Sequence, residues 1–141
     1  MEAECADDWE RLAKDEIESA RIMLAARKWK QVYQHGGIAI ECALKCKIMR
    51  HLRLNRWPDR HERRDLWTHD LEDLFALFMN EAEVARLLAQ ADPPSHLCAW
   101  VIVKDWHIEM RYHNPDAFPE KMARGFLNAA DGMGLIEWLL R

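Results

Sequence analysis

The amino-acid sequence predicts an all-α protein, an antiparallel bundle of four main helices plus one short helix. Half of its 141 residues are apolar, which suffices for a hydrophobic core and excludes a disordered chain. Ser and Thr together occupy only three positions and Val four, while Ala, Leu, Glu, Lys and Arg dominate, so strand formers are scarce and helix formers abundant. We therefore expect residues 1–141 to form one helical domain.

Apolar residues at three- and four-residue steps predict two long helices at the start of the chain. The first runs from residue 7 or 8 to about 29, and acidic residues crowd its opening turns, where the helix dipole favours them. The second spans about 30–54, and Gly36 and Gly37 inside it indicate the close approach of a neighbouring helix. We expect this helix to bury Tyr33, Ile40, Ala43, Leu44 and Ile48.

Shorter elements are expected in the middle of the chain. Residues 55–67 form a loop, and Thr68 is the expected N-cap of a short helix that reaches Phe75. A further short helix over about 81–91 stops before two consecutive prolines.

The last part of the chain predicts two more main helices. One spans about 95–112, and the segment 114–119, which contains two prolines, ends it. The other runs over 120–140.

Charge is unevenly distributed along a chain whose net charge is -4. Residues 1–18 carry eight acidic and two basic side chains, whereas residues 45–64 carry eight basic and two acidic ones. The basic segment either attracts an anion, such as a nucleic-acid backbone, or pairs with the acidic segment of the same or another subunit. The overall balance excludes a globally basic nucleic-acid coat protein.

The sequence indicates a soluble, cytoplasmic protein without membrane association. No apolar run approaches the roughly 20 residues that span a bilayer, and the acidic N-terminus lacks the pattern of a signal peptide. The four cysteines show no paired ligand spacing, so we expect reduced thiols, no metal site and no cofactor.

Three segments together resemble HEPN domains (higher eukaryotes and prokaryotes nucleotide-binding domains). The segment Gln34–Lys45, QHGGIAIECALK, is similar to their second helix, which carries an A-x-E-x-A-L-K pattern. Thr68–Leu74, THDLEDL, resembles the opening of their third helix, and Trp106–Tyr112, WHIEMRY, the end of their fourth. The segments follow the family order and cover nearly the whole chain.

This resemblance implies a helical bundle that commonly dimerises, in prokaryotic defence or toxin–antitoxin systems or beside a minimal nucleotidyltransferase. We take as the main expectation a module that binds nucleotide, RNA or a partner protein. A metal-independent endoribonuclease and an antitoxin-type structural partner of a nucleotidyltransferase are the alternatives.

Catalytic HEPN members use an Arg and a His in an R-x4–6-H motif, and this implies His69 and Arg64 as catalytic candidates. Arg111, in the third similar segment, is the other candidate partner of His69. An imidazole can shuttle the 2′-hydroxyl proton, and a guanidinium can stabilise the charged phosphorane. The structural alternatives are a helix-start role for His69 and an ion pair of Arg111 with Asp70, Glu109 or Asp116.

A second group of side chains could bind the RNA or nucleotide. Clustered arginines meet phosphates, and aromatic rings among them suit single-stranded RNA, although core packing is the alternative for each ring. The candidates are Arg56, Arg60, Arg63, Trp57 and Tyr112. Because seven Trp and four Phe exceed what so small a bundle readily buries, we also expect a homodimer.

Overall fold

The computed structural model describes residues 2–141, and no strand occurs within that range. The helices are α1 (Ala6–Ala25), α2 (Trp29–Leu52), α3 (Leu71–Phe75), α4 (Glu81–Leu88), α5 (Ser95–Val103), α6 (Glu120–Leu127) and α7 (Leu135–Leu139). Single turns lie between them: η1 (Arg64–Leu66), η2 (Ile108–Tyr112), η3 (Pro115–Ala117) and the π-type turn η4 (Asn128–Gly132). The expected all-α class is confirmed.

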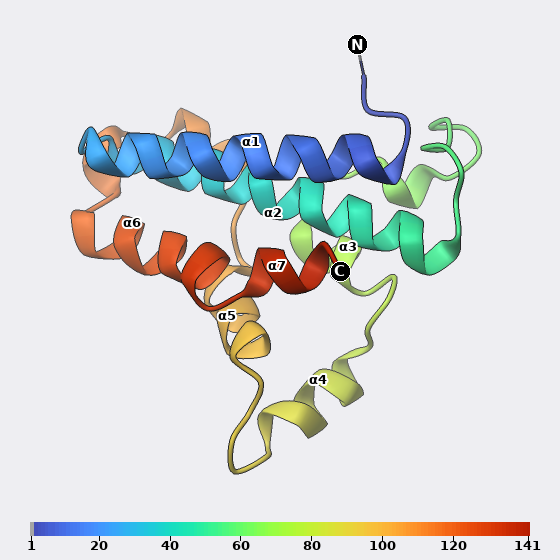
Figure 1. The fold of residues 1–141 in the computed structure, drawn as a ribbon. Helices are drawn as coiled ribbons and strands as arrows, with labels where there is room; N and C mark the ends of the chain where they lie inside the picture. Colours follow the sequence, from blue (N-terminus) through green and yellow to red (C-terminus); the bar gives the residue numbers. More distant parts are fainter. Residues whose placement is uncertain (1) are drawn as a thin grey trace.

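Helix α2 is the central element of the bundle. It packs against α1 as a long antiparallel pair, and α6 and α7 run along its other side (Figure 1). The helix α3 and the turns η2 and η3 also pack on α2, whereas α4 projects away from the bundle between α3 and α5 (Figure 1). The expected bounds of this helix are confirmed to within two residues, and all five side chains predicted to face inward are buried.

The two glycines of α2 permit the close packing that the sequence predicts. A Cβ atom at Gly37 would overlap the indole ring of Trp106, and one at Gly36 would lie 3.0 Å from the ring of Phe126. The Trp106 indole N–H also donates to the carbonyl oxygen of Tyr33, at 2.9 Å. Both contacts bring the C-terminal half of the chain onto α2.

The first helix is shorter than expected, because it ends at Ala25 and not near Trp29. Arg27 adopts a left-handed conformation with φ of 60°, and the N–H of Lys28 donates to the carbonyl of Met23 at 2.9 Å. This arrangement is a Schellman closure, which usually uses glycine at the left-handed position. In this sequence the left-handed position holds Arg27 and not a glycine. Neither residue type nor apolar periodicity therefore marked the end of α1 in the sequence.

The extent predicted for the helix over about 95–112 is also wrong. The helix ends at Val103, and residues 108–112 form the separate turn η2 after an extended residue at His107. The inward turn of Trp106 onto α2 explains the break, because its buried ring and its hydrogen bond to Tyr33 require the chain to leave the helical path.

The last helix is divided as well, where a continuous helix over 120–140 was expected. It passes through the π-type turn η4, and Gly134 takes a φ of 83° before α7 begins.

The short helix α3 begins at Leu71 and not at Thr68, since Asp70 is its N-cap and accepts a hydrogen bond from the N–H of Asp73.

Most of the large aromatic side chains lie inside the bundle. Trp100, Trp106 and all the phenylalanines except Phe78 are buried, and Phe78 is half-buried. The core therefore accommodates most of the rings that led us to expect a homodimer, which stays a prediction. None of the helices within residues 2–141 has the length and apolar character needed to cross a membrane.

Substitutions of a packed and of an unpacked glycine should have opposite effects on the free energy of unfolding. We expect Gly37→Ala to lower the free energy of unfolding by about 1–3 kcal/mol, because the added methyl group overpacks the core against the indole. Gly125→Ala, in α6 with open space around it, should raise that free energy by about 0.5–1 kcal/mol. Urea unfolding followed by circular dichroism measures both, and equal stability of the two variants would contradict the packing described here.

Candidate functional site

The centre of the site is a buried ion pair on α2. Glu41 and Lys45 lie one turn apart, both are buried, and the Lys45 ammonium donates to Glu41 Oε2 at 3.1 Å. The ammonium also lies 5.0 Å from the ring centre of Trp9 and 5.5 Å from that of Trp57. Desolvated cation–π contacts of this kind add to the attraction of the carboxylate. Lys45 therefore belongs to the interior and not to a basic surface.

His69 lies at the end of this network. Its Nδ1 is 2.8 Å from Glu41 Oε1, and because a carboxylate only accepts, Nδ1 must carry the proton. In the neutral form of the imidazole this tautomer leaves Nε2 without a proton, and 58% of the side chain is accessible to solvent. Glu41 thus fixes both the tautomer and the orientation of the ring, as a carboxylate does in an acid–base pair.

His69 lines a cleft of about 340 Å³, here called the His69 cleft, together with a second imidazole from His107. The segment 67–70 forms one wall and the segment 107–109 forms the other. Thr68 accepts a hydrogen bond from the N–H of Asp70 at 3.0 Å, which holds the first wall in a tight turn. The break of the helix after Val103 places the second wall opposite His69.

Trp67 lines both the His69 cleft and a larger cleft of about 530 Å³. Trp9, Trp57 and Trp67 line this tryptophan cleft together with Arg56. Trp57 is nearly buried, packs its ring edge-on to Trp9, and is 9% exposed, so it offers little surface to a ligand. Trp67 is 39% exposed, and its indole N–H donates to the carbonyl of Pro58 at 2.8 Å.

Two exposed aromatic rings, of which Trp67 lines the His69 cleft, each lie in contact with an arginine. The guanidinium of Arg60 lies 5.2 Å from the ring centre of Trp67, and that of Arg111 lies 4.8 Å from the ring of Tyr112. Tyr112 is 76% exposed. Arg111 lines a small recess that adjoins the cleft, since the two share His107 and one further residue.

Several cations of the basic segment 45–64 are already paired. Arg50 bonds Glu10 at 3.0 Å and Asp7 at 3.5 Å, so it pairs with the acidic N-terminal segment of the same chain. Arg56 pairs with Glu62 at 2.9 Å and Arg63 with Asp65 at 2.8 Å, and each arginine lowers the pKa of its carboxylate partner. Only part of the segment is thus free to attract an anion.

The two arginines expected beside His69 are exposed. Arg64 begins the turn η1, and neither it nor Arg111 has a hydrogen-bonded or ion-paired partner among residues 2–141. The ion pairs considered for Arg111, to Asp70, Glu109 or Asp116, are not present in the described part of the chain. Arg111 is therefore available to an anion, although it does not line the His69 cleft itself.

The cysteines on α2 are core side chains. Burial raises the pKa of the Cys42 thiol to about 12, and burial also raises the pKa of Cys46. Among residues 2–141 no group of three or more His, Cys, Asp or Glu side chains is placed to hold a metal ion.

Comparisons with protein-family models, curated proteins and solved structures give no match to this chain. The similarity to HEPN domains stays a prediction that rests on the three sequence segments. The structure does bring these segments together: Glu41 from the first, His69 from the second and His107 from the third meet at one site.

Sequence reasoning missed Glu41 and His107 as members of the site. Glu41 was visible as an acidic residue within a long apolar stretch of α2, which is a signal of a buried and therefore partnered charge. His107 lies in the third similar segment, but a continuous helix was expected there, so the sequence did not place it beside His69.

The buried pair predicts a strong asymmetry between single and double substitutions. Lys45→Met should lower the free energy of unfolding by about 3–5 kcal/mol, since it leaves the Glu41 carboxylate buried without its ammonium partner. The double variant Glu41→Leu/Lys45→Met should recover most of that loss, because no uncompensated charge remains. Urea denaturation of the two variants measures this, and a double variant as unstable as Lys45→Met would refute the account of the pair.

Proposed function

We propose that this protein is a HEPN-like helical module that binds single-stranded RNA, or a nucleotide of the same chemistry, across the His69 cleft. The observation that supports this function is the pair of exposed arginine–aromatic contacts, Arg60 on Trp67 and Arg111 on Tyr112, beside a cleft lined by two histidines. Aromatic faces stack on bases, arginines attract phosphates, and together they bind single strands with little sequence preference.

The charges around the cleft favour this ligand over others. Arg60, Arg64 and Arg111 have no ion-pair partner in residues 2–141, whereas Arg56 and Arg63 are held by carboxylates. An anion therefore meets free guanidinium groups near the cleft without first breaking an ion pair. Tyr112, which is 76% exposed and contacts Arg111, adds a stacking surface for a base.

We expect binding of a fluorescein-labelled uridine oligoribonucleotide to depend on both contacts. Tyr112→Ala should weaken binding by about 1–3 kcal/mol through the loss of one stacked base. Arg60→Gln and Arg111→Gln should each reduce the slope of log affinity against log salt by about 0.7, the value for one lost phosphate contact on a single strand. Fluorescence anisotropy over a salt series gives both quantities.

The matched control is Arg86→Gln, which removes an exposed arginine from α4 and should leave affinity and salt slope unchanged. Wild-type affinity in Tyr112→Ala and both arginine variants would place the binding site elsewhere or remove the function.

A metal-independent endoribonuclease is the second candidate, and the hydrogen bond between Glu41 and His69 favours it. The bond leaves Nε2 of an exposed imidazole free to accept the 2′-hydroxyl proton, and His107 provides a second imidazole on the same cleft. His69 is then the candidate base, and His107, when protonated, is the candidate acid that protonates the leaving 5′-oxygen. Arg64 or Arg111 is the candidate for stabilising the charged intermediate.

If the protein cleaves RNA, His69→Ala should lower the cleavage rate about 10²–10⁴-fold, the usual contribution of a positioned acid or base. A loss in Arg64→Ala alone supports the local R-x4-H pairing, and a loss in Arg111→Ala alone supports a partner from η2. Gel analysis of a labelled RNA measures the rates, and activity should persist in EDTA. Cleavage that survives His69→Ala, or that stops with the chelator, would argue against this mechanism.

A further inference from the structure

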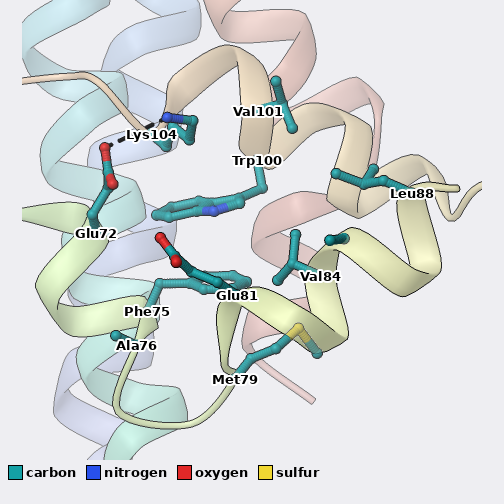
Figure 2. Close-up of a pocket in the computed structure, with 11 residues that line it drawn as sticks. Glu72, Phe75, Ala76, Met79, Glu81, Val84, Leu88, Trp100, Val101 and Lys104 are labelled. Carbon is teal, nitrogen blue, oxygen red and sulfur yellow. Dashed lines mark ion pairs between the residues drawn. The ribbon is translucent and has the colours of Figure 1, made fainter.

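An apolar groove of about 310 Å³ lies between α3, α4 and α5 and shares no lining residue with the His69 cleft (Figure 2). The rings of Phe75 and Trp100 stack at its base, with ring centres 4.1 Å apart. Aliphatic side chains from α4 and α5 form its sides: Val84, Leu88 and Val101. This α4 groove is apart from the surface assigned above to RNA.

Helix α4 is amphipathic, yet none of its residues is buried. Val84 and Leu88 lie one turn apart, so both line the groove from the same face of the helix. Val101, on the facing helix α5, is 46% exposed. Figure 1 shows α4 standing away from the bundle, and a helix in this position leaves apolar surface that an interaction would cover.

The polar rim of the α4 groove is acidic. Its single lysine, Lys104, is neutralised by Glu72 at 3.6 Å and by Asp105 at 3.3 Å. Glu81 has no ion-pair partner among residues 2–141, and in Figure 2 its side chain extends from the start of α4 toward the rings of Phe75 and Trp100. The groove thus presents one free carboxylate beside an apolar floor.

We propose that the α4 groove docks an amphipathic helix of a partner protein that carries Lys or Arg on its polar side. The apolar face of that helix packs on Val84, Leu88 and Val101, in the helix-in-groove mode, and a cation of the partner pairs with Glu81. Charge complementarity selects a basic partner over a second copy of this chain. A two-fold contact through the groove would bring the unpaired Glu81 of both copies into one interface, while the lysine that lines the groove is already paired.

The test uses two synthetic, fluorescein-labelled peptides that share one amphipathic helical pattern, one built from Leu and Lys and the other from Leu and Glu. We expect the wild-type protein to bind the Leu–Lys peptide, and Glu81→Lys and Val101→Lys each to weaken that binding about tenfold or more. Both positions are exposed, and circular dichroism verifies that the variants fold. The control Glu18→Lys makes the same charge change on the acidic helix α1 and should leave the affinity within about twofold.

Three results would overturn the proposal. The first is absent binding, or equal binding of the two peptides. The second is an equal effect of Glu18→Lys and Glu81→Lys, which shows attraction to the overall negative charge. The third is a wild-type dimer in sedimentation equilibrium that Val101→Lys converts to monomer, because a second copy of the chain then occupies the groove.

Discussion

The burial of α2 on every side is the constraint from which the site follows. Residues 39–46 are all buried, so more than two helical turns have no face toward solvent. The two charged side chains in this stretch, Glu41 and Lys45, must be satisfied inside the protein, and they pair with each other. The other carboxylate oxygen of Glu41 accepts a hydrogen bond from His69. The ammonium of Lys45 is covered by one tryptophan from α1 and one from the loop after α2.

This internal pairing positions the cleft. Because Glu41 cannot move to solvent, the imidazole that it holds has a defined place and a defined tautomer. Trp106 packs against Gly37, one turn earlier on α2, and so brings His107 to the other wall of the same cleft. The two arginine–aromatic pairs, Arg60 with Trp67 and Arg111 with Tyr112, lie on loops and turns, where side chains remain free to contact a ligand.

The helical class, the course of α2 and its inward face could be predicted from the sequence, because helix propensity and periodicity are local properties. The breaks after Ala25 and Val103 could not, since the first uses arginine at a left-handed position and the second depends on Trp106 reaching Gly37 across the bundle. Among the residues of the candidate site, His69 was named from the sequence. Its partner Glu41 was noted only as part of the segment Gln34–Lys45, which resembles HEPN domains. The basic segment looked uniform in sequence, but ion pairs that form only in the fold neutralise Arg50 and Lys45.

Nuclear magnetic resonance distinguishes binding of a single strand at the proposed site, the His69 cleft, from binding at another surface. A uridine oligoribonucleotide is titrated into ¹⁵N-labelled protein, with the indole signal of Trp67 assigned by Trp67→Phe. Binding at the His69 cleft predicts that this indole signal and the backbone amides of residues 107–112 shift together as the RNA saturates, while the amides of α4 stay in place. Shifts confined to α4 and α5, or none at saturating RNA, would contradict it.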